Sequence, residues 1–161
     1  MLTDIDRVIA EGGLDGLASA LDGASASEIR YAARRLSHTD DTIEATLQRA
    51  EDFAEHREPS ARQVACHLIP KTFVGDTGRS VALLERLLDD GDWTVRDTAA
   101  TIGGRLLRKN FRTTIGHVRR WRESASPSVR RAAVVAAGRA AHPRHLECCL
   151  LYTSPSPRDR S

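Results

Sequence analysis

An arginine followed by small residues recurs four times along this chain, and no other feature restricts the fold as strongly. The four arginines are 32, 34 and 34 residues apart. A small or apolar residue stands one position before each arginine and again three and six positions after it, and these offsets share one face of an α-helix. The sequence therefore predicts four amphipathic helices, which begin near Arg30, Arg62, Arg96 and Arg130.

A second apolar pattern precedes each of these helices, nine and twelve positions before the arginine. Connections rich in Gly, Pro, Ser and acidic residues separate the two patterns. A pair of antiparallel helices in each 32 to 34 residues is typical of a right-handed α-solenoid of HEAT-like helical pairs. We expect about four repeats over residues 14–141 and a capping helix over residues 3–11.

Composition favours the all-α fold class. Only 4% of the residues are aromatic, and β-branched residues never form alternating runs, so a sheet is not expected. The sequence lacks a run of about 18 apolar residues, and its first residues are acidic, unlike a signal peptide. We therefore expect a cytoplasmic protein that makes no membrane contact and is a monomer.

The last residues break the helical pattern. Residues 149–159 match, position by position, the conceptual translation of a transposase-type sequencing adaptor. We expect one HEAT-like domain over residues 1–148, incomplete at its C-terminus, and a non-native disordered tail over residues 149–161. A solenoid without its last cap exposes apolar surface, which we expect around Val134, Val135 and Ala136.

Neither a metal site nor a cofactor site is predicted. Cys66, Cys148 and Cys149 are odd in number and lack metal-ligand spacing. The histidines are scattered, and even His142 and His145 have no carboxylate or cysteine partner at ligand spacing. We expect Cys66 to be a small core residue.

Charge divides the chain into two parts. Residues 1–97 hold eleven Lys or Arg against nineteen Asp or Glu, whereas residues 98–148 hold eleven against two. Most of the basic residues are arginines, whose planar donor groups suit phosphate. A basic C-terminal half of this kind favours a nucleic-acid backbone as partner. Ion pairs between repeats, or a partner protein, remain alternatives.

Trp93 and Asp97 are the two residues that the repeat does not explain. The residues aligned with Trp93 are Ser or Pro, which are ordinary at a helix start, so we expect a half-exposed aromatic that contacts a ligand. Asp97 follows one helical turn later on an outward face. It either serves a ligand, or interacts with the helix dipole or a basic neighbour such as Arg131. Trp121, by contrast, is aligned with core residues.

These residues resemble a known family. Trp93-x-Val95-Arg96-Asp97, the following Ile102 to Leu107, then Trp121 and the segment Ser128 to Ala133 are similar to the DNA alkylation repair proteins, the HEAT-like AlkD and AlkC group of alkylpurine DNA glycosylases. The resemblance covers about residues 83–137. A second aromatic stands in that family where this sequence has Ser128.

The resemblance implies a DNA glycosylase that acts on duplex DNA. In that family a Trp and an Asp one turn apart face the damaged nucleotide, which implies that Trp93 packs against deoxyribose and that Asp97 stabilises the positive charge developing on the sugar. Gly103 and Gly104 indicate close approach, for which helix packing is favoured over DNA. The expected nucleic-acid contacts are Arg96, Arg105, Arg108, Lys109, Arg112, Arg130 and Arg131.

A second function class remains open. A HEAT-repeat scaffold would hold a protein partner on its concave face, with Trp93 as an anchor and without any chemistry.

Overall fold

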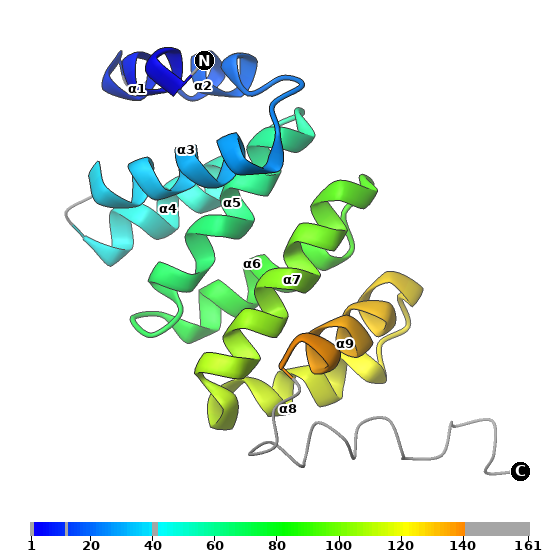
Figure 1. Ribbon diagram of the computed structural model, residues 1–161. Helices are drawn as coiled ribbons and strands as arrows, with labels where there is room; N and C mark the ends of the chain where they lie inside the picture. The colour runs from blue at the N-terminus through cyan, green and yellow to red at the C-terminus, as the bar shows by residue number, and fades with distance from the viewer. Residues whose placement is uncertain (1, 12, 40–41, 141–161) are drawn as a thin grey trace, which may run out of the picture. The chain divides into compact units, whose positions relative to one another are not determined.

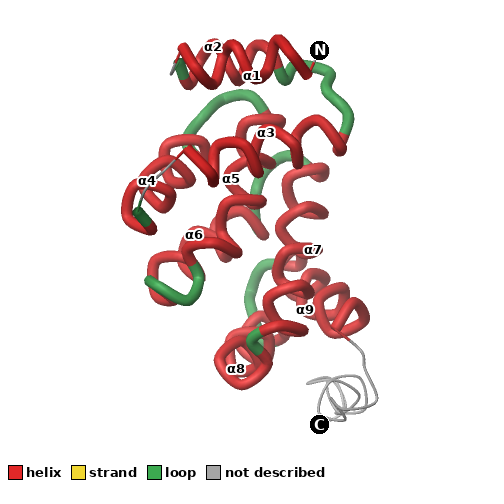
Figure 2. Tube along the Cα trace, turned by 60° about the vertical axis from the view of Figure 1, so that its left-hand side comes forward, coloured by secondary structure: helices red, strands yellow, loops and turns green. Residues whose placement is uncertain are grey.

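The structure is a computed structural model, and it describes residues 2–11, 13–39 and 42–140. Every regular element in these ranges is an α-helix, as the tube in Figure 2 shows, so the predicted all-α class is confirmed. Residues 149–159, for which an adaptor origin is expected, and His142, His145, Cys148 and Cys149 lie outside the described residues. The helices are α1 (Leu2–Glu11), α2 (Leu14–Ala20), α3 (Ala26–Thr39), α4 (Ile43–Ala54), α5 (Pro59–Thr72), α6 (Thr77–Leu88), α7 (Trp93–Lys109), α8 (Phe111–Arg122) and α9 (Pro127–Ala140).

The chain forms two units, Met1–Ala99 and Ala100–Ser161, and α7 begins in the first and continues into the second. In the first unit α5 is the central helix, because it contacts α2, α3, α4 and α6 (Figure 1). In the second unit α8 and α9 form a packed pair. The proposed single domain over residues 1–148 stays a prediction.

The predicted capping helix exists and starts one residue earlier than expected, as α1. It packs on α2 and α3. Asp6 ties it to α3, since its carboxylate accepts hydrogen bonds from the Tyr31 hydroxyl at 2.7 Å and from Arg35 Nε at 2.8 Å. The Tyr31 hydrogen bond, and after it that of Arg35, lowers the pKa of Asp6. These hydrogen bonds therefore hold the N-terminal helix of the first unit against α3.

The repeated apolar positions form the core. Each of the aligned residues before and after the four arginines is buried, which confirms the predicted inward faces. Trp121 is only 2% exposed, so its assignment to the core is also confirmed. Cys66 is completely buried, and burial raises the pKa of its thiol. The buried aligned residues are Ile29, Ala61, Val95, Val129, Ala33, Ala65, Ala99, Ala133, Leu36, Leu68, Ile102, Ala136, Leu21, Phe53, Leu87, Trp121, Ala18, Ala50, Leu84 and Val118.

Three of the four recurring arginines, Arg62, Arg96 and Arg130, close the loops between paired helices. Arg62 Nη1 donates to the carbonyls of His56 and Arg57, at 2.9 and 2.7 Å. Arg96 and Arg130 use Nη1 in the same way, each on the carbonyls five and six residues earlier, at 2.6 to 2.9 Å. A loop carbonyl that no helix satisfies thus receives a charged donor. This contact explains the arginine at three of the four aligned positions.

Close packing of α7 on α9 explains one glycine pair. A Cβ added to Gly104 would lie 2.8 Å from Arg139 Cβ and 3.2 Å from the Ala136 carbonyl oxygen, and one on Gly103 would lie 3.1 Å from the Trp121 ring. The predicted packing role of both glycines is therefore confirmed. Two expectations conflict at Ala136, because the repeat predicts its burial and the missing cap predicts its exposure. Val134 is 53% exposed and Val135 is half-buried, as expected without a cap, but Ala136 is fully buried because its backbone lies against Gly104.

Substituting alanine at two glycines of the second unit should change stability in opposite directions. Gly116→Ala in α8 meets nothing within 4 Å, so the better helix propensity of alanine should raise the free energy of unfolding by about 1 kcal/mol. Gly104→Ala gains the same propensity but must displace α9, and overpacking costs about 1–3 kcal/mol. Urea titrations followed by circular dichroism should show a lower midpoint for Gly104→Ala only. Equal stabilisation by both would contradict the α7–α9 contact.

Candidate functional site

The first two turns of α7 carry the two residues that the repeat does not explain, and Asp92 fixes how the helix begins. Its carboxylate oxygen Oδ1 accepts hydrogen bonds from the backbone N–H groups of Thr94, at 2.8 Å, and Val95, at 3.4 Å, and from the Thr94 hydroxyl. This is an N-cap, in which an acidic side chain also interacts favourably with the helix dipole. The Thr94 hydroxyl is the main cause of a lowered Asp92 pKa.

Trp93 lies at the start of α7 and is 68% exposed, which confirms the exposure predicted for it. The two prolines that align with it, Pro59 and Pro127, open α5 and α9. Asp97 follows one turn later and is half-buried. Residues four apart in a helix are neighbours on its surface, so an exposed indole and a carboxylate lie side by side here.

A hydrogen-bond network joins this turn of α7 to α5. The Gln63 side chain donates through Nε2 to Thr94 Oγ1 at 3.0 Å and accepts through Oε1 from the Thr98 hydroxyl at 3.3 Å. The Thr94 hydroxyl in turn donates to Asp92. Donors and acceptors therefore run in one direction from Gln63 Nε2 through the Thr94 hydroxyl to the Asp92 carboxylate. The Thr98 hydroxyl lies nearer to the Thr94 carbonyl oxygen, at 2.8 Å, than to Gln63. The network holds the helix face next to Trp93 and Asp97 against α5.

Thr94→Val should weaken this network without changing the shape of the side chain. We expect the pKa of Asp92 to rise toward its ordinary value, because the variant lacks the hydroxyl donor. A lowered folded-state pKa stabilises the protein above the unfolded-state pKa of about 3.9 and loses that contribution as the pH falls through the folded-state value. Thr94→Val should therefore be less stable than the wild type at pH 7, and this difference in the free energy of unfolding should shrink below about pH 4. Carboxyl ¹³C titration by NMR measures the pKa, and an unchanged value would remove the hydroxyl as its cause.

The expected phosphate-binding residues have different surroundings. Arg96 is half-buried and lies between Trp93 and Asp97 in sequence, with Nη1 on the Asp90 and Gly91 carbonyls. Arg130 is exposed and has the equivalent contact with Ser124 and Ala125. The structure therefore brings Trp93, Arg96 and Asp97 together on two turns of one helix, and it gives both arginines a structural contact that the sequence had not indicated.

The other expected phosphate contacts are all exposed and belong to the second unit. Its described residues, 100–140, hold ten Lys or Arg and one acid, Glu123, so the predicted basic composition is carried by ordered helices. The exposed members of the predicted set are Arg105, Arg108 and Lys109 in α7, Arg112 in α8 and Arg131 in α9.

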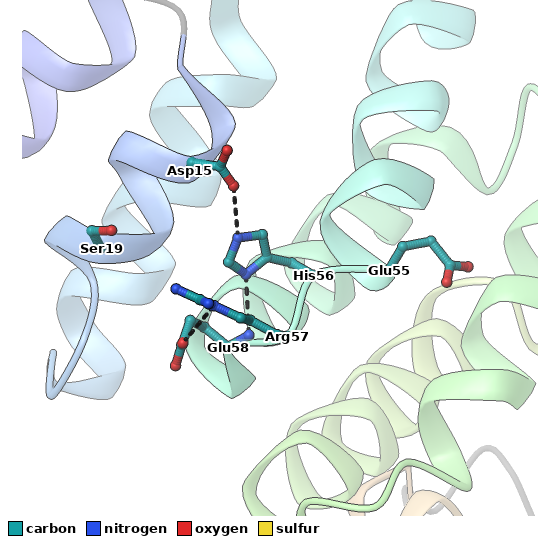
Figure 3. Close-up of a pocket in the computed structure, with 6 residues that line it drawn as sticks. All are labelled: Asp15, Ser19, Glu55, His56, Arg57 and Glu58. Atoms are coloured by element: carbon teal, nitrogen blue, oxygen red, sulfur yellow. Dashed lines mark hydrogen bonds and ion pairs between the residues drawn. The ribbon is translucent and has the colours of Figure 1, made fainter.

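A pocket of about 530 Å³ lies in the first unit, between α2 and the loop before α5 (Figure 3). His56 points to Asp15, with Nε2 at 3.2 Å from the carboxylate, while its Nδ1 accepts the Glu58 backbone N–H at 3.1 Å. Because both ring nitrogens have partners, Nε2 carries the proton and the ring serves to join α2 to the loop. The pocket is lined by Asp15, Ser19, Glu55, His56, Arg57 and Glu58.

Among residues 2–11, 13–39 and 42–140, no group of three or more His, Cys, Asp or Glu side chains could hold a metal ion. Over the same residues, no helix has the length and apolar character needed to cross a membrane.

Gln63, Thr94 and Thr98 are site residues that sequence analysis missed. Their signal was weak, because a threonine pair four residues apart is common on helix surfaces. Gln63 aligns with Asp97 in the preceding segment, so its position on the same kind of outward face was available from the repeat.

Comparison with known proteins identifies one family. A family model described as DNA alkylation repair enzyme matches residues 20–153. No curated protein and no solved structure matches the chain significantly.

Proposed function

The chain belongs to the DNA alkylation repair enzyme family, and from that membership we propose that it binds duplex DNA and excises cationic alkylpurines. The observation that carries the proposal is the start of α7, where Trp93 is 68% exposed and a half-buried carboxylate, Asp97, lies one turn away. An exposed indole offers a flat apolar surface for a sugar or base, and the carboxylate offers a negative charge beside it.

The chemistry needs few groups. A purine alkylated at N3 or N7 is positively charged, so it leaves with the electron pair of its bond to the sugar and becomes neutral. The sugar becomes an oxocarbenium-like cation, to which water adds at C1′ with loss of a proton, and an abasic site remains. In this proposal Asp97 stabilises the cation and positions the water, as one carboxylate does in glycoside hydrolysis. Trp93 packs against deoxyribose, and the damaged nucleotide need not be turned out of the duplex before its base is cleaved.

Binding to DNA is assigned to the basic residues. The exposed side chains of Arg105, Arg108, Lys109, Arg112 and Arg131 contact phosphates in this proposal. Arg96 and Arg130 use Nη1 for loop carbonyls, so their proposed phosphate contacts fall to Nε and Nη2.

Base release tests the proposal. The chain is incubated with methylated duplex DNA, and free 3-methyladenine and 7-methylguanine are measured by chromatography together with abasic sites. We expect stoichiometric release of both products and formation of abasic sites. A chain that binds the duplex at low salt but releases no base would overturn the catalytic part of the proposal.

The exposure of Trp93 also favours one other function, a scaffold that binds a protein partner through this side chain. Exposed tryptophans are frequent energetic centres of protein interfaces. This function predicts neither duplex binding at low salt nor base release, so the same experiment separates the two.

A further inference from the structure

The solvent face of α8 is basic and contains a glycine that packing does not explain. The helix buries Thr114, Ile115, Val118 and Trp121. Its opposite face presents Arg112, Gly116, Arg119 and Arg120, all exposed. These positions follow the helical period, so the three guanidinium groups surround Gly116 on one surface.

Gly116 differs from the glycines of α7. Gly103 and Gly104 have no room for a side chain, whereas an added Cβ at Gly116 would meet nothing within 4 Å. A glycine inside a helix costs about 1 kcal/mol relative to alanine. Because no neighbouring helix requires this glycine, the gap that it leaves faces solvent and is open to a ligand.

The charge of this face is positive along the whole helix. The sequence of α8 contains four arginines and no acid. The adjoining Glu123 lies beyond the helix and is paired with Arg122 at 3.8 Å. Arg120 is held on the surface, since its Nη2 donates to His117 Nδ1. A polyanion thus meets no repulsion from α8 itself.

We propose that the α8 face made of Arg112, Gly116, Arg119 and Arg120 is a docking surface for the phosphate backbone of duplex DNA. Arg112 and Arg119 are seven residues apart, or about 10 Å along the helix axis. This distance equals the rise of about three base pairs along the duplex axis, at roughly 3.4 Å each. Gly116 lets a phosphate approach the helix backbone between the guanidinium groups.

This inference rests on the proposed function: it takes Arg112 and the ligand from it, and adds Gly116, Arg119 and Arg120 as contacts. It assigns DNA anchoring to α8 and leaves base excision to Trp93 and Asp97. The two assignments can therefore fail separately.

The test measures duplex affinity against salt concentration. Each lost phosphate contact lowers the slope of log K against log salt by about 0.9, so Arg112→Gln with Arg119→Gln should lower it by about 1.8. The control is Arg30→Gln with Arg57→Gln, which removes the same charge from exposed positions of the first unit. A slope that falls equally in the control, or not at all in the α8 variant, would overturn the inference.

Gly116→Leu tests the gap separately from the charges. The open space at Gly116 accepts the side chain, so the melting temperature should not fall. Duplex affinity should weaken by about tenfold, because the leucine blocks the approach of a phosphate to the helix. Affinity equal to that of the wild type would contradict the docking surface. If the wild type releases base and the α8 double variant has the wild-type salt slope, only this inference is wrong. If the α8 variants lower DNA binding and no base is released, only the proposed excision is wrong.

Discussion

Replacing Asp97 by asparagine is expected to slow release of 7-methylguanine by about 10²- to 10³-fold, which is the usual cost of removing one group that stabilises transition-state charge. Asparagine keeps the size of the side chain and removes its negative charge. The oxocarbenium-like sugar would then lose its nearest counter-charge, whereas contacts made equally in the ground state would remain. Single-turnover rates at saturating enzyme measure the effect on the chemical step.

A matched control distinguishes position from net charge. Asp89→Asn removes one negative charge from an exposed residue of the loop just before α7. We expect this variant to excise at the wild-type rate, and we expect both variants to bind an undamaged duplex with similar affinity. An Asp97→Asn rate within threefold of the wild type would remove this carboxylate from the mechanism.

Asp90→Ala should produce the largest loss of stability. The Asp90 carboxylate accepts from Arg62 Nε at 2.8 Å and Nη2 at 2.9 Å, and from the backbone N–H of Asp92 at 2.8 Å. The side chains of Arg62 and Asp90 are only 15% and 11% exposed. Removing one partner leaves a largely desolvated charge without its counter-ion, which costs about 3 kcal/mol. For a chain of this size we expect a melting temperature lower by roughly 6–12 °C.

The pair of Arg62 and Asp90 also joins two loops, and the residue next to Asp90 provides a control for the prediction. Arg62 Nη1 holds the loop before α5 while its other nitrogens hold the loop before α7. Asp89→Ala alters the neighbouring exposed residue and should leave the unfolding midpoint within a degree or two of the wild type. Calorimetry of the two variants decides the matter: an Asp90→Ala midpoint that matches Asp89→Ala would show that the ion pair does not stabilise this junction.

The fold was largely predictable because it depends on spacing. Apolar residues at helical offsets determine which face of a helix is buried, and the repeat made that pattern visible four times. The repeat placed Ala136 correctly on a buried face, whereas the exposure expected from a missing cap was wrong there, because Gly104 of α7 lies against it. A glycine in a sequence indicates that another group packs closely against the backbone, but it does not identify that group.

The site was predictable only in part. Trp93 stood out because it departs from its aligned prolines, and its exposure followed from that departure. The hydrogen bonds of Gln63 with Thr94 and Thr98 depend on side-chain distances between two helices, which no sequence spacing provides. Two of the recurring arginines, Arg96 and Arg130, were interpreted as phosphate ligands, yet both donate to loop carbonyls, because an arginine has enough donors for both kinds of contact.

The most direct test of the central claim, that Asp97 stabilises positive charge on the sugar, uses two abasic-site analogues in the same duplex. One carries a protonated pyrrolidine ring, which imitates the oxocarbenium cation, and the other carries a neutral tetrahydrofuran. Stabilisation of a transition state appears as tighter binding of its analogue. We predict that the wild type prefers the cationic duplex by at least about tenfold and that Asp97→Asn loses this preference while binding the neutral duplex unchanged. An equal preference in both proteins would contradict the account.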